Sequence, residues 1–392
     1  MANRTDSSSR REFLTQAAAA AGASAWGVAG NAAAGEPAAK GAVAKDAAAK
    51  PAARVPFIHT TDLYNPPEDP DDWVDLATVY ALPELDVRAV VLDPTRKFTQ
   101  KLDPGFVPVS QMNYLSGRAV PVAVGPMDPL RSPSDTAEDR PRREQAGIEL
   151  LLAALRRSRE PVVVSVVGSA RAITAAWNRA PKLLLEKVRA VVVNAGATTA
   201  KPGAEWNVDL DVHAWVGLFR SRLPIDWYPC TGEDGPTGLN PHNTYWPVAQ
   251  RRLFAELPQP LRAFFDYAFH HAARGDAIGA LRQLGVGASW EKVLVGQRNM
   301  WSTASLATAA GRMLAQMPDG WRFVPPEQAA GRRRAMLELL PVACDVAPNG
   351  VVQWKTTSAP SRIRIFHRKP DAEHVAAMAE ATNAILRQFP LG

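Results

Sequence analysis

From residue 55 onward, short apolar runs alternate with segments whose apolar residues recur at helical spacing. Val87–Leu92, Val162–Val167 and Val188–Val193 are mainly β-branched runs, which is typical of strands buried on both faces of a parallel sheet. The segments Asp72–Leu82 and Gln145–Arg157 place apolar residues three and four positions apart, which predicts helices. This alternation predicts an α/β domain with a mainly parallel central sheet flanked by helices.

The same pattern covers most of the remaining chain. We expect further strands at Val55–Thr61, Val120–Val124, Ile225–Tyr228 and Arg362–Phe366, and a hairpin of Cys344–Val346 with Val351–Trp354. We expect further helices at Ala170–Arg179, Asp211–Arg222, Leu261–Leu284, Thr303–Leu314 and Ala372–Phe389. Together these elements predict one domain over residues 55–392, a length that a single α/β domain reaches.

The first 54 residues have a different composition. Ser9–Leu14 reads SRREFL, a twin-arginine pattern, and a weakly apolar stretch over residues 17–29 follows it. We expect residues 1–34 to be a twin-arginine signal peptide and residues 35–54 to be an Ala/Lys/Pro linker. The alternative is an N-terminal amphipathic arm. The signal peptide would make the mature protein periplasmic or extracellular, without a stable membrane anchor after cleavage.

Charge and cysteine content exclude several classes of function. The net charge is +6, but residues 1–54 carry seven basic and four acidic side chains, which leaves 38 basic and 35 acidic ones in the domain. Such a balanced domain has no concentrated basic field, so we expect no nucleic-acid partner. The two cysteines, Cys230 and Cys344, exclude a disulfide framework and a thiolate zinc cluster. Both flank apolar strands and favour buried free thiols, although pairing after export stays open.

A dense acidic segment follows the first expected strand. Within eleven residues the chain carries Asp62, Glu68, Asp69, Asp71 and Asp72. Carboxylates this close repel one another, and a hard divalent cation such as Ca²⁺ or Mg²⁺ would relieve that repulsion. Capping of the next helix by Asp71 or Asp72 is an equally good explanation.

Two later loops also follow expected strands and carry candidate chemistry. Glu205 and Asn207 offer an acceptor and an amide suited to sugar hydroxyls, although a loop turn explains them as well. The loop over residues 231–246 carries His242 beside several aromatic and acidic side chains and is typical of a lid. His242 is either a catalytic acid or an ordinary loop histidine.

Phe57–Leu92 resembles the opening of the inosine-uridine preferring nucleoside hydrolases, with a strand, an aspartate signature, a helix, a Pro-Glu-Leu turn and a second strand. The resemblance continues through Gln145–Gly168, Ala190–Ala197, Ala204–Asp211 and Leu223–Thr231, and the closing helix has the same order. It implies an α/β fold and cleavage of ribonucleoside N-glycosidic bonds by water on a tightly held Ca²⁺.

The resemblance also assigns roles to individual residues. Asp62 would bind Ca²⁺ and take the proton from water, Asp72 would be a second ligand, and Arg171 would offer its backbone carbonyl to the metal. The candidates for substrate binding are Asp71, Asn194, Glu205, Asn207 and Trp301. The implied partner is a small-molecule nucleoside or sugar, and whether the chain forms a homo-oligomer stays open.

The chain departs from the family pattern at several positions. Thr60 replaces the first signature aspartate, Leu63–Pro70 is a longer segment, Thr199 stands for an asparagine, and Trp301-Ser302 stands where the family has His-Asp. His242, Glu68 and Asp69 are candidate substitutes for the missing groups. These departures leave two hypotheses, a nucleoside hydrolase-like enzyme and a non-catalytic sugar- or nucleoside-binding descendant. A metal-dependent phosphoesterase has little support, because no histidine cluster accompanies the aspartates.

Overall fold

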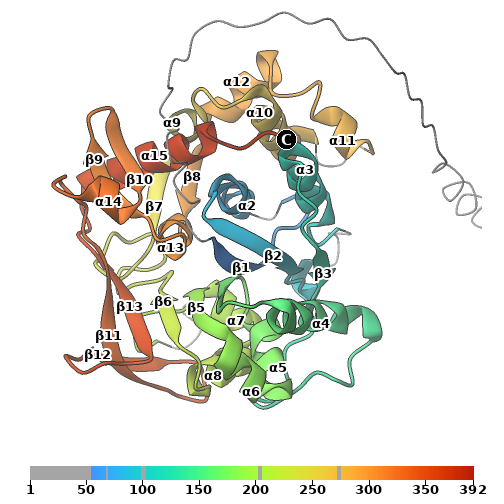
Figure 1. Cartoon of the computed structure of the whole chain (residues 1–392), viewed down its shortest axis with the longest axis vertical. Helices are drawn as coiled ribbons and strands as arrows, with labels where there is room; N and C mark the ends of the chain where they lie inside the picture. The colour runs from blue at the N-terminus through green and yellow to red at the C-terminus, as the bar shows by residue number, and fades with distance from the viewer. Residues whose placement is uncertain (1–53, 68, 99–102, 202–204, 272–274) are drawn as a thin grey trace, which may run out of the picture. The chain divides into compact units, whose positions relative to one another are not determined.

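The central sheet has nine strands in the order β12-β11-β13-β6-β5-β4-β1-β2-β3 (Figure 1). The structure is a computed structural model that describes residues 54–67, 69–98, 103–201, 205–271 and 275–392. The parallel strands are β1 (Val55–Thr61), β2 (Leu85–Leu92), β3 (Val122–Val124), β4 (Val162–Val167), β5 (Val188–Asn194), β6 (Ile225–Tyr228) and β13 (Ile363–Arg368). β11 (Leu337–Val346) and β12 (Val352–Thr356) are antiparallel additions at one edge. The predicted α/β fold with a mainly parallel sheet is confirmed.

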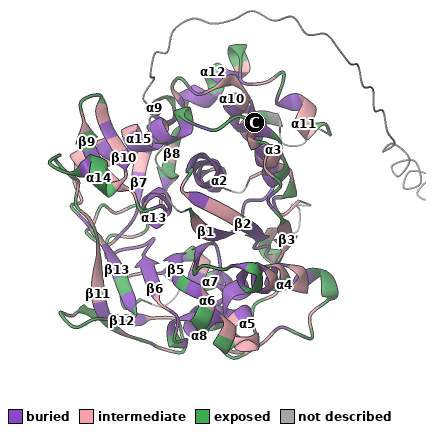
Figure 2. Ribbon diagram, viewed as in Figure 1, coloured by how far each residue is buried: buried purple, intermediate pink, exposed green. Residues whose placement is uncertain are grey.

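Helices cover both faces of this sheet, because alternate side chains of each buried strand point to opposite sides. Phe57 belongs to one hydrophobic core and the adjacent Ile58 to the other. The core of Phe57 includes α2 (Asp71–Ala81), α3 (Phe106–Ser116), α13 (Thr303–Ala309) and α15 (Ala372–Arg387). The core of Ile58 includes α4 (Arg142–Arg157), α5 (Arg171–Arg179), α6 (Pro181–Lys187) and α8 (Val212–Arg220). The buried strands therefore lie between two helical layers (Figure 2).

The position of β1 decides where a ligand can bind. β1 pairs with β2 on one side and with β4 on the other, so the chain builds outward from it in two directions. A crevice forms at such a switch point, beyond the carboxyl ends of the strands. Asp62 follows β1 directly and Gly168 follows β4, so both residues stand at this crevice.

The remaining short elements pack around the sheet. They are η1 (Arg96–Phe98), α7 (Trp206–Leu210), β7 (Trp246–Ala249), α9 (Gln250–Phe254), α10 (Gln259–Asp266), η2 (Tyr267–His271), α11 (Ala277–Ala280), α12 (Gly287–Val295), β8 (Gln297–Met300), β9 (Met313–Met317), β10 (Gly320–Val324) and α14 (Pro326–Ala329). β7 pairs with β8, and β9 pairs with β10, each in antiparallel fashion. Neither of these antiparallel pairs is part of the sequence prediction.

Two predicted helices were wrong in extent. The helix expected at Thr303–Leu314 ends at Ala309, because Gly311 adopts a φ of +78° and the chain enters β9. The helix expected at Leu261–Leu284 divides into α10, the π-helical turn η2 and α11. The predicted hairpin is confirmed, although its first strand begins earlier, at Leu337.

The predictions for the N-terminal region lie outside the described residues. Both cysteines are free thiols, and Cys230 is buried while Cys344 is half-buried. In the described part of the chain, no helix combines the length and apolar character that a membrane span needs.

Candidate functional site

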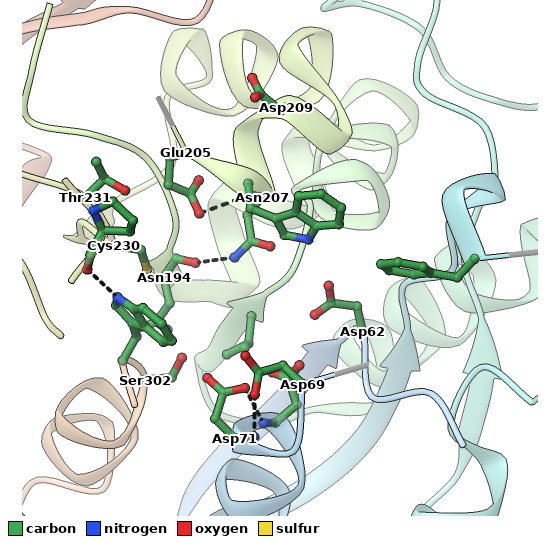
Figure 3. Close-up of a pocket in the computed structure, with 16 residues that line it drawn as sticks. Asp62, Asp69, Asp71, Asn194, Glu205, Asn207, Asp209, Cys230, Thr231 and Ser302 are labelled. Carbon is green, nitrogen blue, oxygen red and sulfur yellow. Dashed lines mark hydrogen bonds between the residues drawn. The ribbon is translucent and has the colours of Figure 1, made fainter. Parts of the chain in front are cut away.

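A cleft of about 560 Å³ opens at the switch point beside β1 (Figure 3). Its floor consists of residues at the carboxyl ends of parallel strands, including Asp62 after β1, Val167 in β4 and Asn194 in β5. Asp71 and Asp72 enter from the first turn of α2, and Trp301 and Ser302 enter just before α13. Segments far apart in the sequence thus meet at one edge of the sheet.

Six acidic residues line the cleft: Asp62, Asp69, Asp71, Asp72, Glu205 and Asp209. Among the described residues that line it there is no Lys, Arg or His. Burial and the nearby Asp93 carboxylate raise the pKa of Asp62 to about 8. Burial, followed by repulsion from Asp69 and from Asp62 respectively, raises the pKa values of Asp71 and Asp72 well above the usual range. The cleft therefore favours any ligand or transition state that brings positive charge.

Local hydrogen bonds at the start of α2 explain part of this acidic segment, although the N-cap residue is Pro70 and the helix has no side-chain cap. Asp69 Oδ1 accepts the backbone N–H of Asp71 at 3.3 Å, and Asp71 Oδ1 accepts that of Asp72 at 3.0 Å. Arg298 Nη1 also lies 3.3 Å from Asp69 Oδ1. These contacts account in part for Asp69 and Asp71. They do not explain why the carboxyl groups of Asp62 and Asp72 share the same cleft.

Glu205 fixes the loop that carries Asn207. Its Oε1 accepts the backbone N–H of Asn207 at 3.0 Å, and its Oε2 accepts those of Gly196 at 2.7 Å and Val208 at 3.0 Å. Glu205 is thus the N-cap of α7, a role that the sequence analysis did not predict. It still borders the cleft, but three backbone donors already occupy its two oxygen atoms.

The two asparagines of the cleft are linked to each other. Asn207 Nδ2 donates to the backbone carbonyl of Asn194 at 3.1 Å, which orients the Asn207 amide at the rim (Figure 3). Asn194 is fully buried, and within the described chain its Oδ1 has no hydrogen-bond partner. Because a buried acceptor without a partner costs free energy, this oxygen atom is suited to a ligand hydroxyl.

A glycine sets the position of Asp62. Gly168 has a φ of +122°, and a Cβ added there would lie 3.1 Å from Asp62 Oδ1 and 3.1 Å from Asp93 Oδ2. The lack of a side chain at Gly168 therefore lets two carboxylates approach the end of β4. Ser169 holds the second carboxylate by donating its backbone N–H to Asp93 Oδ2 at 2.7 Å.

Arg171 lies behind this floor and does not line the cleft. Its buried guanidinium has Nη1 3.7 Å from Asp93 Oδ1 and Nε 3.4 Å from Asp211 Oδ2. It also donates to the backbone carbonyls of Pro94, Pro126, Met127 and Leu210. The side chain of Arg171 thus holds together several loops beneath the cleft. The sequence analysis considered only its backbone carbonyl and did not predict this role of the side chain.

The structure places His242, a candidate catalytic acid in the sequence analysis, outside the cleft. The ring packs against Trp354 and His367, with centroid distances of 4.8 and 5.2 Å, and its Nδ1 lies 2.8 Å from the carbonyl oxygen of Phe366. His242 is not among the residues that line the cleft. Contacts with β12 and β13 thus hold it elsewhere, and burial lowers its pKa.

Aromatic rings form two walls of the cleft. Trp206, whose side chain is 47% exposed, stacks on Phe98 with a centroid distance of 5.8 Å, and the Lys97 amine lies 4.5 Å from the centroid of the indole. Trp301 donates from Nε1 to the carbonyl of Pro236 at 3.2 Å and packs against Tyr245. The sequence did not single out Phe98, whose only signal is its position after β2.

Ser302 lies in the cleft in front of a buried carboxylate. The hydroxyl of Ser302 hydrogen-bonds to the Asp75 side chain, and Thr303 Oγ1 donates to Asp75 Oδ1 at 3.5 Å. Asp75 is fully buried in α2, one turn beyond Asp71 and Asp72. Burial raises its pKa to about 7 in spite of these two hydrogen bonds. A buried carboxyl group thus stands behind Ser302, where the family pattern has an aspartate.

The fit of the cleft to a divalent cation rests on its donor atoms. The carboxylates of Asp62 and Asp72 and the unpartnered Oδ1 of Asn194 are oxygen donors, which Ca²⁺ and Mg²⁺ prefer. In the described ranges, no three His, Cys, Asp or Glu side chains are arranged to hold one ion. The residues fit a hard cation in donor chemistry, with two carboxylates instead of a complete cage.

The fold resembles those of solved nucleoside hydrolases. A plant nucleoside hydrolase, PpNRh1, aligns with a TM-score of 0.50 and 14% identity over 84% of this chain and 98% of that one. The chain has a nucleoside hydrolase-like fold. The purine-preferring ribonucleoside hydrolase from Gardnerella vaginalis aligns with a TM-score of 0.48 and 14% identity, over 85% of this chain and 99% of that one. The inosine-uridine preferring nucleoside hydrolase from Bacillus anthracis gives 0.46 and 9%, over 86% and 99%. At the level of sequence, no family model and no curated protein matches the chain.

Proposed function

We propose that this nucleoside hydrolase-like protein cleaves the N-glycosidic bond of a ribonucleoside or a related glycoside in the cleft beside β1. The observation that carries the proposal is the acidic lining of that cleft, whose described residues include no basic side chain, although Arg298 pairs with Asp69 from outside the lining. Cleavage of an N-glycosidic bond develops positive charge on the sugar ring. Fixed carboxylates stabilise such a transition state more than the neutral substrate.

In this mechanism Asp62 is the general base. Its carboxylate stands after the end of β1 at the cleft floor, where it would accept a proton from a water molecule bound in the cleft. Asp62 and Asp72 would hold Ca²⁺, the cation implied by the resemblance. When bound, Ca²⁺ supplies positive charge that makes a nearby water easier to deprotonate.

Other cleft residues would hold the substrate. Asn194 Oδ1 would accept a hydrogen bond from a sugar hydroxyl, and Asp71 and Asn207 would bind further hydroxyls. Trp206 and Trp301 present aromatic surfaces at the cleft walls, and a nucleobase would stack on them. The leaving base would depart without help from a histidine, because the described cleft residues include none.

The test is ribose release from a panel of ribonucleosides by the wild type and the Asp62→Asn variant. Loss of a positioned general base should lower kcat by about 10²- to 10⁴-fold. Asp139→Asn is the control, because Asp139 is half exposed and is paired with Arg131 outside the cleft. The proposed role of Asp62 fails if both variants retain wild-type activity. The proposed function fails if the wild type binds nucleosides without releasing sugar.

We also propose that the protein is exported by the twin-arginine route. The SRREFL motif at Ser9–Leu14 supports this proposal. Replacing Arg10 and Arg11 together by lysine should retain the full-length chain in the cytoplasm, as measured by fractionation of expressing bacteria. Unchanged export of this variant would contradict the proposal.

A further inference from the structure

A second cavity, of about 230 Å³, lies where the loop after β13 meets the start of α15. It shares no lining residue with the acidic cleft. Its walls include three basic residues, Arg333, Arg334 and Lys369, and the face of Trp321. The chemistry of this cavity is therefore opposite to that of the cleft.

The two acids in its walls are already neutralised by neighbours. Glu373 Oε2 pairs with Arg333 Nη2 at 2.5 Å, and Asp371 Oδ2 pairs with Lys369 Nζ at 2.8 Å. Asp371 also caps α15 by accepting the backbone N–H of His374 at 2.8 Å. The guanidinium of Arg334 contacts the neutral sulfur of Met313 at 3.9 Å, so its charge is available to a ligand.

The wall also contains a buried polar side chain that lacks a partner. His374 lines the cavity and is only 4% exposed, and within the described chain its Nδ1 has no hydrogen-bond partner. Burial lowers its pKa to about 3, so the ring is neutral, and Nδ1 can carry its single proton. In that tautomer His374, a residue of the cavity wall, carries a donor that no described group satisfies.

Arg368 places a second unsatisfied group close behind His374. Its side chain is 1% exposed, and neither Nη1 nor Nη2 has a hydrogen-bond partner among the described residues. Arg368 does not line the cavity, and its Nε donates to the carbonyl of Asn240 at 3.3 Å, but its positive charge helps to lower the pKa of His374. A buried guanidinium with unpaired N–H groups is costly unless an acceptor satisfies it.

We propose that this cavity is a binding site for a small anion with phosphate or carboxylate oxygen atoms. Such oxygens would accept a charge-assisted hydrogen bond from Arg334 and a hydrogen bond from His374, and the buried charge of Arg368 behind the wall would add attraction. The volume equals that of about seven or eight water molecules, which suits inorganic phosphate or a small dicarboxylate.

The test is calorimetric titration of the full chain in a chloride buffer, with inorganic phosphate in one arm and succinate in the other. Saturable binding of one anion per chain supports the site, and the arm that shows binding identifies whether the site prefers phosphate or carboxylate oxygen atoms. Arg334→Gln, an exposed position, should weaken binding by about tenfold, the effect of losing one charge-assisted hydrogen bond. Arg332→Gln is the control, because this exposed arginine removes the same charge but does not line the cavity.

A second variant addresses the buried donors. His374→Phe removes the unpartnered Nδ1 while retaining a ring of similar size, and it should weaken binding about as much as Arg334→Gln. The proposal fails if neither anion binds saturably to the wild type. It also fails if Arg332→Gln weakens binding as much as Arg334→Gln does, because the attraction would then be general to the surface.

Discussion

Replacing Arg171 by methionine should destabilise the protein more than any loss of a surface charge. Methionine fills much of the arginine volume but leaves the buried Asp93 and Asp211 carboxylates without their counter-charge. Removing one partner of a buried ion pair costs about 3–5 kcal/mol. We therefore expect the free energy of unfolding to fall by about 4 kcal/mol, a large share of the 5–15 kcal/mol that is typical of a protein.

The assay is urea denaturation followed by tryptophan fluorescence, at a pH near neutrality. Arg251→Met is the matched control, because Arg251 and Glu291 are 61% and 63% exposed and such pairs contribute about 0–1 kcal/mol. Arg171→Lys retains the charge but presents fewer donors to the carbonyls of Pro94 and Pro126, so its loss should be intermediate. If the free energy of unfolding falls no more in Arg171→Met than in Arg251→Met, the buried ion pairs of Arg171 do not stabilise the fold as proposed.

Three further effects follow from the structure. Burial lowers the pKa of His59 to about 3, so the unfolded chain binds a proton at this residue before the folded chain does, and the free energy of unfolding falls as the pH drops below 6.5. At about pH 5 this loss is about 2 kcal/mol. Urea titrations near pH 7 and pH 5 should show that His59→Leu removes it. Gly168→Ala should reduce ribose release by about 100-fold, because its Cβ would displace Asp62, whereas Gly311→Ala, with φ +78° and no atom within 4 Å, should retain activity. Trp206→Ala should raise KM for an aromatic-base nucleoside about tenfold in steady-state kinetics, and an unchanged KM would exclude stacking there.

The sequence predicted the central sheet well, because its strands are buried on both faces. β1, β4 and β6 have the predicted bounds, since each is a short, mainly apolar run bounded by charged residues, proline or glycine. The strands β7 to β10 were missed, because they are short and their pairing depends on distant partners rather than on local pattern. Gly311, whose φ is positive, follows the end of α13, and the spacing of hydrophobic residues gives no sign of this helix end.

The site residues at the ends of buried strands could be predicted from the sequence, whereas those that depend on distant contacts could not. Asp62 and Asn194 end buried strands of the same parallel sheet, so the strand pattern alone brings them to one edge. His242 belongs to a loop whose path is determined by contacts with Trp354 and Phe366, which no local pattern indicates. The carboxylate of Asp75 behind Ser302 was also missed, because a single aspartate in an apolar helix carries no sequence signal of its neighbours.

Release of free ribose from ribonucleosides by the full-length wild-type chain, with added Ca²⁺ and after chelation, tests the central claim most directly. We predict equal amounts of free base and free sugar in the presence of Ca²⁺, and a large loss of both after chelation. Thermal stabilisation of the protein by nucleosides with no release of sugar under either condition would contradict the hydrolase proposal and identify the cleft as a binding site.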